Sequence, residues 1–274
     1  MDRSSVFADG MLDGRVALVT GGGTNLGKEA AAELVRCGAR VVIAGRREEV
    51  LAGAAAEIGA DQVAGDIREP ADAERIVGHA LERHGRLDVL VNNAGGQYFV
   101  PAEAIAAKGW RAVTRLNVGG TELMTRTAQR LAFAPQGEGT ILNVTLSPHH
   151  GLAGMTHSSA ARAAVEAYTR AWADELAPTT VIALAAGHFD TESLRKYPEP
   201  VYRGAARTVP LQRLGRMEEH AWLVALCASP LGRALTGSVV TLDGARDNWF
   251  GPWPPPTLAG DGGEVPTEAR RPAD

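Results

Sequence analysis

The sequence of 274 residues has few cysteines, no long apolar run and no concentration of positive charge. Its two cysteines, Cys37 and Cys227, are far apart and lie in stretches of helical pattern, which indicates buried thiols rather than a disulfide or metal site. No apolar run approaches the roughly 20 residues that cross a bilayer, and the first ten residues lack the apolar core of a signal peptide. The 28 basic residues are scattered and the net charge is −4, which disfavours nucleic acid or a membrane surface as partner. We therefore expect a cytoplasmic protein that acts on a small molecule.

Short β-branched runs alternate with Ala-rich helical stretches from residue 15 onward, a pattern typical of βαβ units and a parallel sheet. The strands are apolar throughout, as expected when helices cover both faces of a sheet. Strands are predicted at 16–20, 41–44, 62–65, 87–91, 140–144, 181–185 and 238–242, and long helices at 26–37, 48–58, 71–84, 110–133 and 157–177. The length permits one such domain, which we place at residues 12–246 after an N-terminal extension of residues 1–11.

Two regions depart from this alternation. Residues 187–214 contain Pro198, Pro200 and Pro210 and follow the carboxyl end of a predicted strand, which predicts a lid over a ligand. The tail, residues 247–274, holds Trp249, Phe250 and Trp253 before the prolines at 254–256, an aromatic cluster that we expect to pack against protein. Its Gly-, Glu- and Asp-rich end, residues 258–274, is expected to be disordered.

A glycine-rich turn, Thr20-Gly21-Gly22-Gly23-Thr24-Asn25-Leu26-Gly27, joins the first predicted strand to the first predicted helix. Such a turn lets backbone amides approach a pyrophosphate, and the helix N-terminus adds partial positive charge. The spacing resembles the TGxxxGxG motif of the short-chain dehydrogenase/reductase family, and it predicts cofactor contacts from Gly21, Gly23, Thr24, Asn25, Leu26 and Gly27. Asn25 replaces a glycine of that motif, and asparagine tolerates positive φ better than most residues.

Further motifs strengthen the resemblance. Asp66-Ile67 resembles the family's adenine-contacting pair, and Asn92-Asn93-Ala94-Gly95 reproduces its NNAG motif. Gly187 and Thr191 resemble the loop that holds the nicotinamide amide, and Asp243-Gly244-Ala245 resembles the terminal DGG. The resemblance covers about residues 12–246 and implies an α/β fold, a single Rossmann-type doubly wound domain with a seven-stranded parallel sheet. It also implies cofactor contacts from Asp66, Ile67, Asn93, Ala94, Gly95, Gly187 and Thr191.

The cofactor type is predicted from the end of the second strand. NAD-selective enzymes place an acid there to bind the ribose 2′-hydroxyl, whereas this chain reads Ala44-Gly45-Arg46-Arg47. Without a carboxylate to repel a phosphate, and with guanidinium groups to bind one, Arg46 and Arg47 favour NADP(H). The alternative is that both arginines only face water at the start of a helix.

The proton-transfer residues that the resemblance implies are replaced in this chain. The Tyr and Lys of the family's Tyr-x-x-x-Lys pair are Ser158 and Arg162, its Ser is Leu146, and its Asn is retained as Asn117. Serine donates a hydrogen bond but is a poor acid, and arginine stays charged, so Arg162 is predicted to hold the cofactor ribose or an oxyanion. The glycine loop and Ser158 resemble the corresponding residues of the dienoyl- and enoyl-thioester reductases of this family. Those enzymes deliver hydride to a conjugated carbon. The displaced Tyr of that branch corresponds to Ser147.

Histidines could supply the missing proton, because imidazole titrates near neutral pH. His149, His150, His157 and His188 are all expected near the mouth of the crevice, and His157 adjoins Ser158. The predicted catalytic set is Asn117, Ser158, Arg162, Ser147 and His157.

Three functions remain open at this stage. The first is an NADP(H)-dependent oxidoreductase acting on an activated C=C or a polarised carbonyl, with a thioester as one candidate substrate. The second is a non-redox step such as dehydration, isomerisation or cyclisation, and the third is a non-catalytic assembly partner. The resemblance also implies a homodimer or homotetramer through the helices predicted at 110–133 and 157–177, where Ala160, Ala163 and Ala167 permit close approach.

Overall fold

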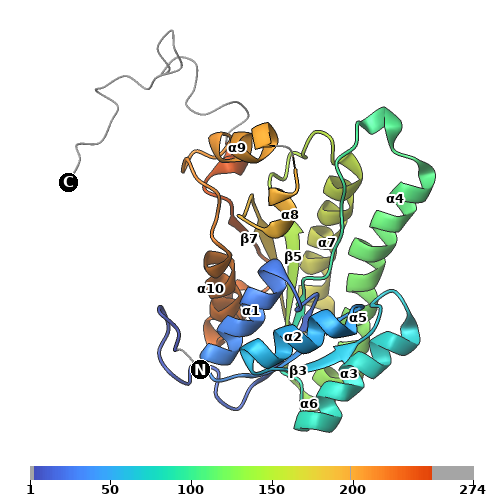
Figure 1. The fold of residues 1–274 in the computed structure, drawn as a ribbon. Helices are drawn as coiled ribbons and strands as arrows, with labels where there is room; N and C mark the ends of the chain where they lie inside the picture. Colours follow the sequence, from blue (N-terminus) through green and yellow to red (C-terminus); the bar gives the residue numbers. More distant parts are fainter. Residues whose placement is uncertain (1–2, 198, 249–274) are drawn as a thin grey trace, which may run out of the picture.

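Residues 3–197 and 199–248 are described by the computed structural model, which shows a seven-stranded sheet with helices on both faces (Figure 1). All strand pairs are parallel, and the strand order is β3-β2-β1-β4-β5-β6-β7. The strands are β1 (Val16–Thr20), β2 (Arg40–Gly45), β3 (Asp61–Ala64), β4 (Val89–Asn92), β5 (Thr140–Leu146), β6 (Thr180–Ala186) and β7 (Val239–Leu242). The order reverses between β1 and β4, which creates the crevice where doubly wound folds bind ligands. The predicted fold class is confirmed.

The helices alternate with the strands as the sequence predicted. They are α1 (Asn25–Arg36), α2 (Glu48–Ile58), α3 (Pro70–His84), α4 (Ala107–Thr114), α5 (Thr121–Ala128), α6 (Ala134–Gln136), α7 (Thr156–Glu175), α8 (Glu192–Arg195), α9 (Glu199–Arg207) and α10 (Met217–Ala228). Glycines in the left-handed conformation end α2 at Gly59 and α3 at Gly85. The segment predicted to be a lid contains two short helices, α8 and α9, and Pro198, between them, lies outside the described residues.

The helix predicted at 110–133 is longer and less regular than expected. Helical backbone runs from Ala107 to Gln136, with π-helical turns at Arg115–Gly120 and Gln129–Phe133. In the first of these turns, the Asn117 side chain donates a 2.9 Å hydrogen bond to the Val113 carbonyl and so competes with the regular backbone ladder. Such π-bulges are frequent at functional sites.

Two apolar cores lie on opposite faces of the sheet. Alternate strand residues such as Val19, Ile43 and Leu142 pack with α1, α2 and α10, whereas Leu18, Leu90 and others pack with α3 and α5. Both cysteines are buried free thiols, as predicted, and burial raises the pKa of each to about 11. The continuous apolar strands thus reflect burial on both sides.

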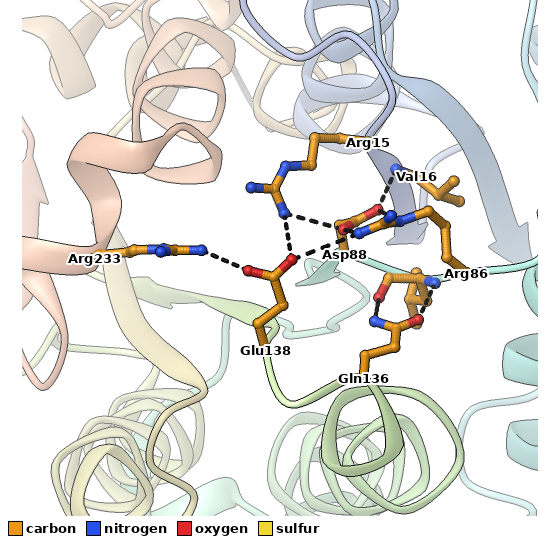
Figure 2. A network of polar contacts seen from close by, with 8 residues as sticks. Arg15, Val16, Arg86, Asp88, Gln136, Glu138 and Arg233 are labelled. Atoms are coloured by element: carbon orange, nitrogen blue, oxygen red, sulfur yellow. Dashed lines mark hydrogen bonds and ion pairs between the residues drawn. The ribbon is translucent and has the colours of Figure 1, made fainter.

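A network of charged groups joins the amino-terminal ends of the strands (Figure 2). The carboxylate of Asp88, 1% exposed, accepts hydrogen bonds from the Val16 amide at 2.8 Å, from Arg86 at 2.6 and 2.9 Å and from Arg15 at 3.1 Å. Glu138 lies beside Arg15 and Arg86 and pairs with Arg233 at 2.6 Å. Burial opposes ionisation of Asp88, but the arginines and the amide outweigh it and lower its pKa. This network fixes the end of the sheet opposite the crevice.

The aromatic residues Trp249, Phe250 and Trp253, and the whole stretch 258–274, lie outside the described residues, so their predicted packing and disorder stay predictions. Within 3–197 and 199–248, none of the helices has the length and apolar character needed to span a bilayer.

Candidate active site

A cavity of about 800 Å³ lies at the carboxyl ends of the strands, and Ser193 and Leu194 of α8 form part of its lining. Its volume lies in the upper part of the roughly 300–1,000 Å³ range of ligand pockets. The cavity is lined by every residue predicted to bind the cofactor: Gly21, Gly23, Thr24, Asn25, Leu26, Gly27, Arg46, Arg47, Asp66, Ile67, Asn93, Ala94, Gly95, Arg162, Gly187 and Thr191. Segments distant in the sequence therefore converge on one cavity, as the resemblance implied.

The glycine loop is held against the end of β4 by polar side chains. The Thr20 hydroxyl accepts hydrogen bonds from the Asn93 and Ala94 amides at 3.1 and 3.0 Å, and the Asn93 side chain donates to the Thr20 carbonyl at 2.9 Å. Gly21 has φ +66° and packs on Asn93, which leaves no room for a Cβ. The first turn of α1 has neither a side-chain cap nor an acidic residue, so its amide groups are free to bind an anion.

Asn25 links the glycine loop to the lid. Its φ is +47°, and its side-chain oxygen accepts a 3.0 Å hydrogen bond from the backbone amide of Glu192, the first residue of α8. Thr191 caps the same helix by accepting from the Leu194 amide at 3.3 Å. The residue that departs from the glycine motif thus ties two walls of the cavity together.

Two cations, Arg46 and Arg47, line the cavity directly after the end of β2. Arg46 and Arg47 are exposed and, within 3–197 and 199–248, form no hydrogen bond or ion pair through their guanidinium groups. The nearby carboxylate of Asp66 is instead bound by the side chain of Arg68, which holds its pKa at about 2. Arg46 adds a weaker electrostatic attraction to Asp66, so Arg68 is the principal partner of this carboxylate, and the guanidinium groups of Arg46 and Arg47 are still able to bind a phosphate.

Arg162, on α7, lines another part of the cavity. It donates a 2.8 Å hydrogen bond to the Val144 carbonyl, and its Nε is buried without a partner among the described residues. The second guanidinium nitrogen lies so close to Gly95 that a Cβ there would overlap it. Burial lowers the pKa of Arg162 to about 10, so the group is still a cation at neutral pH.

Asn117 and Ser158 do not line the cavity, but both bind the loop that does. The Asn117 side chain donates to the Gly96 carbonyl at 2.8 Å and accepts from the Gly96 amide at 3.1 Å. The hydroxyl of Ser158, fully buried, donates to the side-chain oxygen of Gln97 at 2.8 Å. Gln97 lines the cavity and was not predicted as a site residue, because the sequence gives no sign that Ser158 reaches a residue 61 positions away.

Ser147 and His157, also predicted to be catalytic, are turned away from the cavity. The Ser147 hydroxyl is fully buried and donates to the carboxylate of Asp243. His157 is fully buried against Tyr98, with ring centroids 4.5 Å apart, and neither ring nitrogen has a partner among the described residues. The position of His157 does not support the predicted role in proton transfer, because its ring does not reach the cavity.

Of the four histidines expected at the crevice mouth, His188 is the one that lines the cavity. Burial, assisted by Arg246, lowers its pKa to about 4, so it is neutral at pH 7. His149 lies outside, between Asp247 at 2.5 Å and the buried Glu166 at 3.2 Å. Burial disfavours the cation of His149, yet Asp247 and Glu166 raise its pKa overall. His150 also faces Asp247, at 3.7 Å.

Apolar side chains from the lid and from the rest of the domain line much of the cavity. They are Tyr98, Phe99, Leu116, Leu146, Leu152, Met155, Phe189 and Leu194, with Tyr197 from the lid. The hydroxyl of Tyr98 points at Gly109 of α4, where a Cβ would collide with it, rather than toward Arg162. This wall can accept an apolar chain next to a cation.

Comparison with known proteins agrees with this geometry. A family model described as enoyl-(acyl carrier protein) reductase matches residues 22–245. A probable 2,4-dienoyl-CoA reductase of Bacillus subtilis is 33% identical over 255 residues, which cover 89% of this chain and 100% of the relative. A peroxisomal 2,4-dienoyl-CoA reductase of Pongo abelii is 35% identical over 251 residues, 87% of this chain and 86% of that one. The chain belongs to the short-chain dehydrogenase/reductase family.

Solved structures of the short-chain dehydrogenase/reductase family are similar over most of the chain. A citronellol catabolism dehydrogenase of Pseudomonas aeruginosa is 34% identical, with a TM-score of 0.79 over 89% of this chain and 99% of that chain. An actinorhodin polyketide ketoreductase variant with NADPH is 28% identical, with a TM-score of 0.82 over 88% of this chain and 100% of that chain. As a short-chain dehydrogenase/reductase, the protein is an oxidoreductase related to dienoyl-CoA reductases.

Proposed function

We propose that the protein is an NADP(H)-dependent reductase of conjugated C=C bonds in acyl thioesters. The observation that carries the proposal is the distribution of charge in one cavity. Arg46 and Arg47, which form no hydrogen bond or ion pair among the described residues, line one part of it, and the half-buried Arg162 lines another part together with apolar side chains. The likeness to two 2,4-dienoyl-CoA reductases supports this substrate class.

The residues present fit a dinucleotide phosphate. The uncapped start of α1 would bind the pyrophosphate, Arg46 and Arg47 the 2′-phosphate, and Gly187 and Thr191 the nicotinamide amide. When bound, NADPH supplies a hydride. A polyketide ketoreductase of this fold has been solved with NADPH, which supports the same cofactor here.

Arg162 holds a positive charge where negative charge would develop on the substrate. Its guanidinium is half-buried and still protonated, and among the described residues it donates one hydrogen bond, to the Val144 carbonyl, so it can hold a ribose or polarise an oxygen. A group that stays charged cannot relay a proton to a ketone oxygen. The position therefore favours hydride addition to a carbon conjugated with the carbonyl, where the charge on oxygen needs stabilisation rather than immediate protonation.

The experiment is a substrate panel. Purified protein is mixed with NADPH or NADH and with crotonyl-CoA, 2,4-hexadienoyl-CoA, a simple ketone or a simple aldehyde, and loss of nicotinamide absorbance is followed. We expect turnover of a conjugated thioester with NADPH and none of the simple carbonyls. Conversion of a thioester without cofactor consumption would favour a non-redox step instead, and turnover of the ketone alone would reject the proposal.

We also propose that the protein is a cytoplasmic homodimer or homotetramer assembled through α4 and α7. Trp110 on α4 and Tyr168 on α7 are 41% and 38% exposed, and Ala163 and Ala167 are exposed on α7. Large apolar side chains exposed beside small ones are typical of helix pairs that pack against a second copy. Sedimentation of a monomer at micromolar concentration would contradict this assembly.

A further inference from the structure

One histidine outside the cavity is held between two acidic groups, one at each nitrogen of its ring. His149 lies in the loop after β5, and its Nδ1 is 2.5 Å from the Asp247 carboxylate, which also accepts a 2.6 Å hydrogen bond from the His149 backbone amide. Its Nε2 is 3.2 Å from the carboxylate of Glu166, whose side chain is 7% exposed. A neutral imidazole has one N–H, whereas an imidazolium has two. Only the charged form of His149 can therefore donate to both carboxylates.

These contacts join three segments that are far apart in the sequence, and we call His149, Asp247 and Glu166 the His149 clamp. Asp247 lies in the last described turn of the chain, and Glu166 lies on α7, one turn after Arg162. The loop of residues 147–155, which contains His149, supplies apolar side chains to the cavity lining. The clamp therefore fastens a wall of the cavity to the helix that carries Arg162.

The segment that contains Asp247 also supports the cavity wall at Gly187. The Asp243 carboxylate accepts hydrogen bonds from the Asp247 amide at 2.8 Å and from the Ser147 hydroxyl. Gly187 lines the cavity and packs so closely on Asp243 that a Cβ there would lie 2.5 Å from the Asp243 Cβ. The His149 clamp thus connects the Gly187 side of the cavity with the α7 side.

The charges around His149 favour its cation. Three carboxylates and one further imidazole act on this part of the protein, and they belong to Asp247, Asp243, Glu166 and His150. Arg246, beside Asp247, donates its hydrogen bond to the Thr208 carbonyl at 2.9 Å. Burial disfavours the cation of His149, but the carboxylates outweigh it and raise its pKa.

We infer that His149 is a positioning residue for the cofactor, which as a cation holds the Gly187 side and the Arg162 side of the cavity together and on losing its proton lets them separate. The Asp247 contact is the shorter of the two, so neutral His149 keeps its N–H there and turns the lone pair of Nε2 toward Glu166. The buried carboxylate of Glu166 then loses its cationic partner, and the loop of residues 147–155 is released from α7. The inference goes beyond the proposed function and takes from it only the identity of the cofactor.

The direction of the pH dependence follows from the raised pKa of His149. The clamp is complete below about pH 6.5, the ordinary value for histidine, and is lost as the pH rises through the higher value in the folded protein. Gly187 and Arg162 both line the cavity, so NADPH should bind more tightly when the clamp holds them in place. Because coupling is reciprocal, bound NADPH should in turn raise the pKa of His149 further.

The test is the Kd of NADPH, measured by nicotinamide fluorescence between about pH 6.5 and 9. For the natural protein we expect Kd to rise about 5- to 10-fold over this range, at the low end of typical coupling between sites. His149→Gln cannot carry the charge and should bind weakly at every pH. Glu166→Gln should bind tightly at every pH, because its amide can donate to the Nε2 of neutral His149.

His79→Gln is the matched control, because His79 lies on α3 and does not line the cavity. This variant should follow the natural protein at each pH, which also accounts for titration of the NADPH phosphates. Melting temperatures of all variants show whether the fold is intact.

A titration of the histidine ring signals by NMR tests the same coupling without any substitution in the clamp. The His149 signal is identified by its loss in His149→Gln, and its pKa is measured with and without NADPH. A 5- to 10-fold effect on Kd corresponds to an increase of about 0.7–1 in the pKa of His149 when NADPH binds.

The inference is overturned if the natural protein binds NADPH equally well across the pH range, if NADPH leaves the pKa of His149 unchanged, or if folded Glu166→Gln keeps the full pH dependence. These outcomes are distinct from failure of the proposed function. A protein that binds NADPH in this pH-dependent way but reduces no thioester would contradict the proposed function alone. A protein that binds neither NADPH nor NADH would contradict both.

Discussion

Replacing Arg46 or Arg47 by alanine should weaken binding of NADPH and leave NADH unaffected. Neither guanidinium pairs with another group among the described residues, so no existing ion pair must break when a phosphate binds. A hydrogen bond to a charged group contributes about 1.5–3 kcal/mol. Both arginines are exposed, so solvent screens part of this, and about 1–2 kcal/mol per arginine remains. That corresponds to about 5- to 30-fold in Kd.

The assay is titration of nicotinamide fluorescence with NADPH and with NADH at low and high salt. Arg40→Ala is the matched control, because Arg40 begins β2 at the opposite end of the strand and carries the same charge. The loss for Arg46→Ala and Arg47→Ala should shrink at high salt, as expected of exposed charges. Equal weakening of NADH binding and NADPH binding, or no weakening of either, would show that these arginines do not bind the 2′-phosphate.

Three other perturbations test different parts of the structure. Asp88→Asn should lower the free energy of unfolding by about 2–3 kcal/mol. This loss is smaller than that for a fully buried ion pair, because Arg15 and Arg86 are partly exposed and still pair with Glu138 in the variant. The pKa of Asp88 is lower in the folded protein than its value of about 3.9 in the unfolded chain. Its contribution to stability is therefore present above about pH 3.9 and is lost as the pH falls through the folded-state pKa, which chemical denaturation at several pH values would show. Glu192→Pro removes the backbone N–H that donates to Asn25, at the first position of a helix, where proline is well tolerated. This variant should release NADPH faster in stopped-flow measurements. Glu192→Ala keeps the N–H and should release NADPH at the natural rate. His188→Gln should leave the pH profile of kcat unchanged between about pH 6 and 9, because a histidine with a pKa of about 4 does not titrate in that range. Loss of a rising or falling part of the profile in the variant would contradict this prediction.

Much of the fold could be predicted because each strand and helix has a recognisable pattern in its own stretch of the sequence. Strands buried on both faces are continuous apolar runs, and each is followed by a helix of the right length, so the parallel sheet follows from order alone. The predicted ends of two strands differ from the observed ends. The strand predicted at 140–144 extends to Leu146, and the one predicted at 87–91 begins at Val89, because polar residues at strand ends carry no clear signal.

The cofactor part of the site was predictable for a related reason. Its residues follow strand ends whose relative positions the topology fixes, so the backbone alone brings Gly21, Asn93 and Gly187 to one cavity. The chemical part depends on side-chain directions instead. Ser147 turns to Asp243, which no spacing in the sequence reveals.

The histidines show the same limit. Proximity in sequence to Ser158 suggested that His157 enters the site, yet one residue further along a helix is a rotation of about 100°. His157 consequently faces Tyr98, and Ser158 faces Gln97. Gln97 was overlooked because an amide in a loop has no distinctive pattern until its partner is seen.

The atom that accepts the hydride can be identified by isotope tracing. The protein is incubated with 2,4-hexadienoyl-CoA and NADPH carrying deuterium at the transferred position, and the product is examined by mass spectrometry and NMR. The account predicts that deuterium appears on a carbon of the acyl chain, with one C=C lost and the thioester carbonyl intact. Deuterium on a newly formed alcohol carbon, or a converted thioester that contains none, would contradict it.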